Sequence, residues 1–286
     1  MKSLDARILD IYDALTPLER RLADVVLEHQ RELASYSATE LAVQADVSKA
    51  TAARLFKRLG YSSYKDARHQ SRTLRRWGSP LSLLEGLEEF DASQPSIVAH
   101  LQNDIANLTR TFGALRPETT GQVIDMLVRA DRIWVIGFRA SHELAELAAF
   151  WLKHLKYNVS LLPSGWMTFA EDMIDMRPGD AVLAIGFRRR PRMFRALLQN
   201  ARDVGANVIL VTDLSASGAA RFAHVVLRCH SRPSGVFDSY AAATSLLNYL
   251  LAALALREGT TVRPRLQHIE NLHDKLDAFT VPTRSR

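Results

Sequence analysis

Basic side chains dominate one stretch near the start of the chain, where they are suited to binding phosphate groups. Between Val47 and Trp77 the only acidic residue is Asp66, whereas the basic residues are Lys49, Arg54, Lys57, Arg58, Lys65, Arg68, Arg72, Arg75 and Arg76. Such an imbalance is the electrostatic pattern expected of a surface that binds nucleic-acid backbones. A basic helix by itself is more often an ordinary solvated face, but this segregation of charge favours DNA as the partner.

A helix-turn-helix is predicted over residues 37–60, so that its second helix lies in this basic stretch. Ser37 and Glu40 have capping-box spacing, which predicts the start of a first helix. Ser48 can cap a second helix, and Gly60 supplies the left-handed residue that often follows a helix end. Apolar residues of the second helix share one face, which would bury it: Ala52, Leu55, Phe56 and Leu59.

The opposite face of the second helix carries the residues that we expect to contact DNA, which are Ser48, Lys49, Ala50, Thr51, Arg54, Lys57 and Arg58. In a major groove, side chains at the start of such a helix reach base edges, and basic side chains also hold phosphates. We expect Lys49, Thr51 and Arg54 to read bases. Lys57 and Arg58 are expected to hold phosphates.

Alternating strands and helices are predicted in the second half of the chain. Apolar runs over residues 132–137, 158–162, 180–186, 207–212 and 224–229 alternate with helical segments over residues 118–129, 141–156, 192–204 and 237–256. This rhythm predicts an α/β fold with a doubly wound parallel sheet. Ligands of such sheets bind at the carboxyl ends of the strands, so the loops after Gly137, Gly186 and Thr212 are the candidate site.

Two of these loops carry residues suited to binding an anion. Ser141 stands at a predicted helix N-terminus, where free N–H groups and the helix dipole favour negative charge. Arg139 precedes it, and a cluster of arginines follows Gly186: Arg188, Arg189, Arg190 and Arg192. Guanidinium groups form forked hydrogen bonds to carboxylates and phosphates. The alternative is a solvated basic loop in a domain that binds no ligand.

The chain is predicted to contain two domains and a linker. Residues 1–77 form an all-helical domain, with helices over residues 4–15, from Thr16 to about Leu33, and from Ser62 or Ser63 toward Trp77. Residues 78–96, rich in Ser, Glu and Pro, form the linker, and residues 97–286 form the α/β domain. The first helix of that domain, over residues 97–115, has a row of apolar residues that is either core or a dimer seam: Ile97, Leu101, Ile105 and Leu108.

Composition narrows the class of protein. The 286 residues are 47% hydrophobic, enough for two cores, and the net charge of +6 points to an anionic partner. The single cysteine, Cys229, excludes an intrachain disulfide and fits a reducing cytoplasm. No metal-ligand spacing and no cofactor motif is present. The most apolar stretch, residues 241–256, is shorter than the ~20 residues of a bilayer span, and the N-terminus lacks the apolar core of a signal peptide. We therefore expect a cytoplasmic protein with no membrane partner.

Nearly the whole chain resembles the RpiR family of bacterial transcriptional regulators, which join a helix-turn-helix to a sugar isomerase (SIS) domain that senses sugar phosphates. The similar blocks are residues 15–21 (LTPLERR), 45–51 (ADVSKAT) and 58–61 (RLGY), the Gly-x-x-x-Ser loop over residues 137–141, and residues 205–213 (GANVILVTD). Asp46 stands where the family usually has glycine. Aspartate tolerates the left-handed conformation of that turn better than most residues do.

The resemblance implies a ligand site whose loops depart from the family pattern. SIS domains typically bind phosphate with a Gly-x-Gly-x-Ser loop and a Ser-x-Ser-Gly-x-Thr loop. Here Ser141 is kept, Arg139 replaces the second glycine, and the other loop has arginines in place of all three hydroxyls. The family often places ligand-contacting hydroxyls near residues 237–240, which suggests Ser239. The predicted ligand-binding residues are Gly137, Arg139, Ser141, Gly186, Arg188, Arg190 and Ser239.

The predicted function is a DNA-binding transcriptional regulator whose SIS-type domain senses a small anionic metabolite, a phosphorylated or carboxylated sugar derivative. The alternative is a sugar-phosphate isomerase or lyase. Such an enzyme needs a positioned acid or base, but the helix after the first loop is expected to carry His142, Glu143 and Glu146 outward, so no catalytic residue is predicted. We expect a homodimer or tetramer on a palindromic double-stranded operator, joined through residues 237–256 and 97–108.

Overall fold

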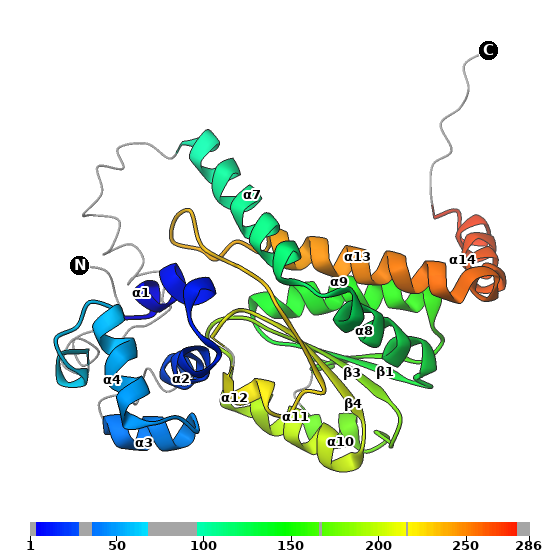
Figure 1. The fold of residues 1–286 in the computed structure, drawn as a ribbon. Helices are drawn as coiled ribbons and strands as arrows, with labels where there is room; N and C mark the ends of the chain where they lie inside the picture. Colours follow the sequence, from blue (N-terminus) through cyan, green and yellow to red (C-terminus); the bar gives the residue numbers. More distant parts are fainter. Residues whose placement is uncertain (1–3, 29–35, 68–95, 166–167, 216, 279–286) are drawn as a thin grey trace.

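A helical N-terminal part and a three-layer C-terminal part make up the fold (Figure 1). The protein is represented by a computed structural model, which describes residues 4–28, 36–67, 96–165, 168–215 and 217–278. The predicted end of the second helix near Leu33, most of the helix toward Trp77 and the linker up to residue 95 lie outside these ranges. None of the helices in the described ranges has the length and apolar character that a membrane crossing requires.

The N-terminal part contains the predicted helix-turn-helix. Its elements are α1 (Leu4–Ile11), a 3-10 helix (Tyr12–Ala14), α2 (Pro17–Glu28), α3 (Ala38–Gln44) and α4 (Lys49–Arg58). The predicted capping box of Ser37 and Glu40 is present, and Thr16 and Glu19 form a second one. In each, the hydroxyl accepts a hydrogen bond from the backbone N–H of the glutamate, whose carboxylate accepts one in return. Asp46, in the turn between α3 and α4, adopts a left-handed φ of 52° as predicted.

A five-stranded parallel sheet forms the middle layer of the C-terminal part. Its strands are β1 (Ile133–Gly137), β2 (Val159–Leu162), β3 (Ala181–Gly186), β4 (Asn207–Thr212) and β5 (Val225–Arg228), in the order β2-β1-β3-β4-β5. The connections reverse direction between β1 and β3, and this switch point is where doubly wound sheets bind their ligands. The prediction of a doubly wound parallel sheet is confirmed.

Helices cover both faces of the sheet, since successive strand residues point to opposite sides. Ile133 and Val135 pack with α8 (Pro117–Arg129), α9 (Ala140–Leu155) and α13 (Ala241–Glu258). Trp134 and Ile136 belong to the cluster on the other face, beneath α11 (Arg192–Val204) and the short α10 (Phe169–Met173) and α12 (Ser217–Ala220). A 3-10 helix (Gly259–Val262) and α14 (Arg263–Lys275), which the sequence reading did not anticipate, follow α13.

The exposure of the apolar row of helix α7 (Ile97–Ala114) excludes one of the two alternatives left open for it. Ile97, Leu101 and Ile105 are 85%, 56% and 51% exposed, so the reading of this row as domain core is wrong. The side chains that α7 buries are polar instead. Asn107 exchanges hydrogen bonds with the backbone of Arg232, and Thr111 accepts one from the backbone of His230.

The two parts of the chain are in contact. Helix α12 packs beside α2 (Figure 1), and the buried side chain of Leu214, from the loop after β4, belongs to the hydrophobic cluster of the N-terminal part. An ion pair of 3.3 Å joins Arg228 of β5 to Asp24 of α2. The loops at the carboxyl end of the sheet therefore touch the helix-turn-helix.

Candidate functional site

A pocket of about 170 Å³ lies at the topological switch point of the sheet. It is lined by residues 138–141 after β1, by Arg188 and Arg189 after β3, and by residues 236–238 and Tyr240 before α13. The helix α13 begins at Ala241, four residues later than predicted, so residues 237–240 form a connecting segment on the pocket wall. Its small volume suits a small metabolite, since pockets for drug-sized ligands measure ~300–1,000 Å³.

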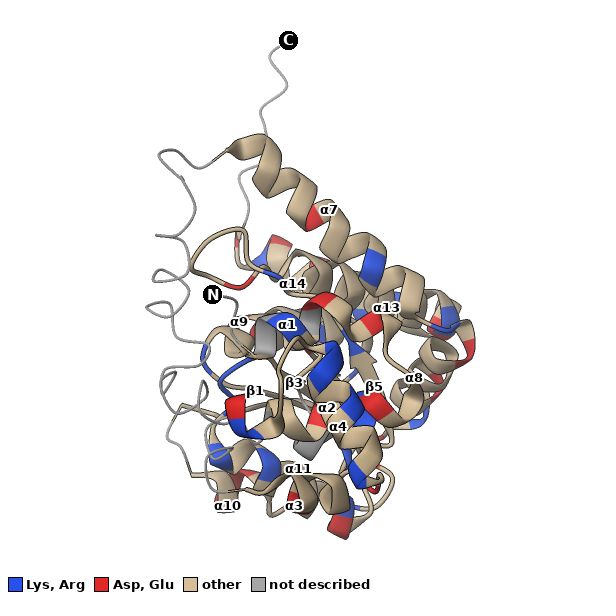
Figure 2. Ribbon diagram, turned by 60° about the vertical axis from the view of Figure 1, so that its left-hand side comes forward, with Lys and Arg blue, Asp and Glu red and all other residues tan. Residues whose placement is uncertain are grey.

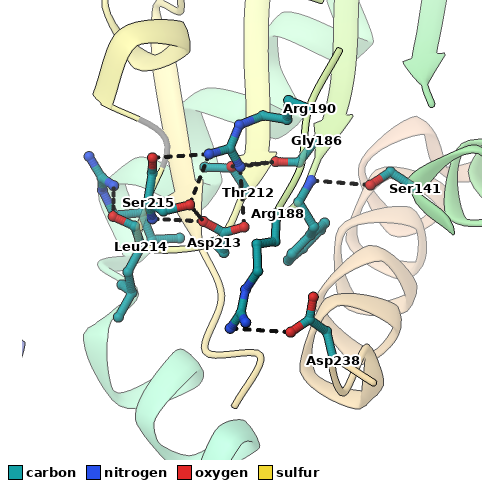
Figure 3. Close-up of polar contacts among 11 residues, drawn as sticks. Ser141, Gly186, Arg188, Arg190, Thr212, Asp213, Leu214, Ser215 and Asp238 are labelled. Carbon is teal, nitrogen blue, oxygen red and sulfur yellow. Dashed lines mark hydrogen bonds and ion pairs between the residues drawn. The ribbon is translucent and has the colours of Figure 1, made fainter. Parts of the chain in front are cut away.

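Ser141 joins the two loops at the centre of the site. Its buried hydroxyl accepts a hydrogen bond of 3.1 Å from the backbone N–H of Phe187 (Figure 3). A serine hydroxyl has one proton to donate besides the lone pairs that accept. The proton of Ser141 is therefore available to an anion bound at the N-terminus of α9.

The glycines at the two strand ends serve the packing of the site. A Cβ on Gly137 would lie 2.3 Å from the carbonyl oxygen of Ser141, and one on Gly186 would lie 2.5 Å from the ring of Phe194. Neither glycine lines the pocket at the switch point. Their role in this structure is to let α9 and α11 approach the sheet.

Arg139 occupies a backbone conformation that suits glycine. Its φ is 56° and its ψ is −134°, a region that residues with a Cβ rarely adopt. The chain thus keeps the geometry of a glycine loop while it places an exposed guanidinium at the pocket. Strained residues of this kind concentrate at functional sites.

Arg188 and Asp238 form an ion pair inside the pocket. Their side chains are only 8% and 14% exposed, and Arg188 Nη2 lies 3.2 Å from Asp238 Oδ1. Burial raises the pKa of Asp238, and the positive charge of Arg188 opposes this rise. Burial and the nearby carboxylate of Asp238 also raise the pKa of the Tyr240 hydroxyl to about 12, so this phenol stays protonated at neutral pH. Asp238 is a pocket residue that the sequence reading missed.

Arg190 points away from the pocket, contrary to the expectation that it binds ligand. Its guanidinium donates to Asp213 Oδ2 at 3.1 Å, to the carbonyl oxygen of Gly186 at 3.0 Å, and to both the carbonyl oxygen and Oγ of Ser215 at 3.0 and 2.9 Å (Figure 3). Asp213 is desolvated by burial, but the charge of Arg190 and hydrogen bonds from Ser215 outweigh this and lower its pKa. Arg190 thus belongs to the loop after β3 and has a structural role, because it holds the loop after β4 in place.

One further expected ligand residue, Ser239, has another position. Ser239 does not line the pocket; its hydroxyl donates to Asp104 of α7 at 2.6 Å. Arg189 does line the pocket, and its φ of 64° is again left-handed. His142, considered for acid–base chemistry, lies 3.5 Å from Glu146 and 3.3 Å from the carbonyl oxygen of Gly137, and does not line the pocket.

Metal binding and thiol chemistry find no support in the described part of the chain. Within the described ranges, no group of three or more His, Cys, Asp or Glu side chains lies close enough to hold a metal ion. Cys229 is buried, and burial together with the charge of Asp213 raises the pKa of its thiol to about 12. A protonated buried thiol is inert as a nucleophile.

The candidate DNA interface is the exposed face of α4. Ser48 caps the helix by accepting a hydrogen bond from the backbone N–H of Thr51, and Lys49, Ala50, Arg54 and Lys57 are exposed. Basic positions along α4 appear in blue in Figure 2. These residues leave a slim, positively charged surface that can approach a major groove.

Two residues expected to contact DNA are engaged within the domain. Thr51 is 4% exposed, and its hydroxyl bonds to Ser48 and accepts from Arg54 at 3.3 Å, so the expectation that it reads bases is corrected. Arg58 donates to Glu19 at 3.0 Å and to the carbonyl oxygen of Ala14 at 2.8 Å. Its guanidinium therefore holds α4 against the start of α2.

Comparison with known proteins assigns both parts of the chain. Residues 2–72 match the helix-turn-helix domain of the rpiR family, and residues 126–256 match the SIS domain. The HTH-type transcriptional regulator HexR of Pseudomonas aeruginosa is 26% identical over 99% of this chain and 98% of its own length. The crystal structure of the sugar isomerase domain of an RpiR transcription factor from Sphaerobacter thermophilus matches with a TM-score of 0.59 and 29% identity, over 62% of this chain and 99% of that one.

A second solved structure has the same fold over nearly the whole chain. The Vibrio vulnificus NanR protein, solved in complex with ManNAc-6P, matches with a TM-score of 0.58 over 96% of this chain and 99% of that one. Its identity of 19% extends the likeness to the fold alone. With a helix-turn-helix of the rpiR type followed by an SIS domain, this chain belongs to the RpiR family of transcriptional regulators.

Proposed function

We propose that the pocket at the switch point binds a small anionic metabolite, a phosphorylated or carboxylated sugar derivative, and that its binding changes the affinity of α4 for an operator. The observation that carries this proposal is the pocket itself, which gathers Arg139, Arg188 and Arg189 beside the N-terminus of α9 in a chain that also has a helix-turn-helix. NanR, a protein of the same fold, was solved with ManNAc-6P, which supports a sugar phosphate as the class of ligand.

Anion binding follows from the charges at the pocket. Arg139 and Arg189 present guanidinium groups, and the hydroxyl proton of Ser141 can be donated to an oxygen at the helix N-terminus. Gly137, Gly186, Arg190 and Ser239 support these loops from behind and are not part of the proposed contact surface.

DNA recognition is assigned to Ser48, Lys49, Ala50, Arg54 and Lys57. Lys49 and Arg54 are proposed to reach base edges, and Lys57 to hold a phosphate. Residues 1–77 would form the DNA-binding domain, residues 78–96 a linker, and residues 97–286 the effector-binding domain.

A symmetric dimer would supply two such helices to a palindromic operator. The exposed apolar row of α7 and an apolar groove of about 360 Å³ between α9, α13 and α14 are the proposed interfaces. Trp151, Leu251 and Leu266 line that groove.

We further propose that the chain is not an enzyme. An isomerase or lyase needs an acid or base free to move a proton. Asp238, a carboxylate on the pocket wall, is held by Arg188, and the Tyr240 phenol has a pKa of about 12.

The function is tested with the full-length protein and labelled DNA from the regions flanking its own gene. We expect Arg54→Ala to weaken binding to a specific fragment by ~1–3 kcal/mol and binding to random DNA much less, as for a base contact. Lys57→Ala should weaken both and flatten the salt dependence. Lys153→Ala, on α9, is the matched control. If the wild type binds no fragment at low salt, or if no acidic metabolite changes its affinity for a fragment that it does bind, the proposed function fails.

A further inference from the structure

We propose that Asp238 makes the pocket select anions that also carry hydroxyl groups: the effector's hydroxyls donate to Asp238 while its anionic group binds Arg188. This inference rests on the proposed function of the pocket and names the residue that would recognise the hydroxyl groups of its ligand. It begins from the pairing of Arg188 and Asp238 across the pocket, from two different segments of the chain (Figure 3).

Arg188 is already neutralised before an effector arrives. Its side chain is 8% exposed and its Nη2 lies 3.2 Å from Asp238 Oδ1. A guanidinium paired in this way is a weaker attractor for an incoming anion, because the two opposite charges cancel at a distance. An anion that binds here must therefore compete with the Asp238 carboxylate.

An anion without other polar groups would lose this competition. A second negative charge beside Arg188 would also lie close to Asp238, and like charges repel strongly where water is excluded. Hydrogen-bond donors on the same ligand reverse the balance, because they compensate Asp238 for the ion pair with Arg188 that the anion weakens, and Asp238 Oδ1 is a buried oxygen with no hydrogen-bond partner in the described residues. Burial already disfavours the charge on Asp238, as does the carboxylate of Asp213, so donors to its oxygens are favourable.

Hydroxyl donors fit this pocket better than ammonium donors. Three guanidinium groups stand at the pocket wall, on Arg139, Arg188 and Arg189, and they would repel a cation. The remaining wall is apolar, with the rings of Phe138 and Phe237 and the side chain of Val236, and suits the carbon face of a small ring or chain. A sugar derivative with one acidic group has all of these features.

The test compares full-length wild type with Asp238→Asn by calorimetric titration of matched ligands. A panel of hexose 6-phosphates supplies anions with hydroxyls, and hexyl phosphate and inorganic phosphate supply anions without them. We expect the wild type to bind the best hexose phosphate at least tenfold more tightly than hexyl phosphate. In Asp238→Asn the hexose phosphate should bind more weakly and hexyl phosphate more tightly. The ratio of the affinity for the hexose phosphate to the affinity for hexyl phosphate should therefore fall about tenfold.

Controls separate selection by Asp238 from a structural role. Asp203→Asn, an equal change of charge on the exposed end of α11, should leave the ratio unchanged, and Asp238→Glu should retain most of it. Melting temperatures without ligand report the folding of each variant. If Asp238→Asn does not fold, the wild type still tests the inference, because hexyl phosphate that binds as tightly as the best hexose phosphate would overturn it. An equal loss of affinity for all anions in Asp238→Asn would overturn the inference. Failure of every anion to bind the wild type would instead overturn the proposed function.

Discussion

Arg139 combines a strained backbone with a charged side chain at the mouth of the pocket. The φ of 56° and ψ of −134° cost of order 1–3 kcal/mol for a residue with a Cβ. Nothing in the packing around the loop requires an arginine, since the side chain is exposed. An exposed guanidinium at this position suits the anionic effector that we propose for the pocket.

Two substitutions of Arg139 separate the cost of its strained backbone from the contribution of its guanidinium to ligand binding. Arg139→Gly should raise the free energy of unfolding by about 1 kcal/mol, because glycine adopts this conformation without strain. It should also reduce the thermal shift that an acidic ligand produces. Arg139→Ala is the matched control, since it removes the guanidinium but keeps the Cβ. We expect the ligand response to fall in both variants and the stability to rise in the glycine variant only; a stabilised alanine variant would contradict the strain argument.

The arginine cluster shows that the sequence can predict which loop carries the charged residues but not the direction in which each side chain points. The position of Arg188, Arg189 and Arg190 after a buried strand was enough to identify one loop of the pocket, which Arg188 and Arg189 line. It could not show that Arg189 adopts a left-handed φ of 64°, which sends Arg188 toward Asp238 and Arg190 toward Asp213. Asp238 was missed for a related reason: the helix was expected to begin at Phe237, and it begins at Ala241.

At the scale of elements, the central strands β1, β3 and β4 could be predicted closely because they are apolar runs that the sheet buries on both faces. The prediction for β4 was identical to its observed bounds, and that for β3 began one residue early. Helix α14 was missed because it buries no side chain and so has no marked apolar periodicity. The apolar row of α7 was found, but its exposure depends on which face the chain turns toward the sheet, and local sequence does not fix that.

The loop after β4 depends on Arg190. Asp213 is fully buried, and its pKa is held below the ordinary value of 3.8, because Arg190 and Ser215 together outweigh the cost of burial. A carboxyl with a lowered folded-state pKa stabilises the fold at pH values above its unfolded pKa. That contribution is lost as the pH falls through the folded pKa, below about 4.

Arg190→Met should destabilise the protein by ~3–5 kcal/mol at neutral pH, because it leaves Asp213 buried and unpaired. The pKa of Asp213 should rise, so that this penalty shrinks as the pH is lowered and the carboxyl becomes neutral. The double variant with Asp213→Asn should recover part of the loss. Urea denaturation between pH 4 and 8 measures both effects. Equal stability of wild type and Arg190→Met at pH 7 would mean that the pair contributes nothing.

At the scale of the whole molecule, the pocket and the DNA-binding part are joined by a short series of contacts. Arg190, in the loop that carries the pocket residues Arg188 and Arg189, holds the loop after β4 in place. Leu214 of that loop is buried in the N-terminal cluster. The carbonyl oxygen of Leu214 accepts a hydrogen bond of 3.2 Å from Arg228, which also pairs with Asp24 of α2. A shift of the pocket loop thus has a direct route to the helix-turn-helix.

This arrangement predicts a variant that binds effector and fails to respond to it. Arg228 and Asp24 are 27% and 16% exposed, so their ion pair is partly desolvated, and removing Arg228 breaks an ion pair between the two parts. Coupling between an effector and DNA is typically worth ~1–3 kcal/mol, a 5- to 150-fold change in affinity. We expect Arg228→Ala to bind an acidic ligand as the wild type does, while the ligand-induced change in DNA affinity falls at least fivefold.

The matched control for Arg228 is Arg257→Ala, which removes an exposed ion pair with Asp125 inside the C-terminal part. It should leave both ligand binding and the response of DNA affinity intact. Because linkage is reciprocal, the same loss must appear when ligand affinity is measured with and without saturating DNA. An Arg228→Ala protein that responds fully by both measurements would place the coupling elsewhere, since the contacts of Leu214 and α12 with the N-terminal part would then be sufficient to carry it.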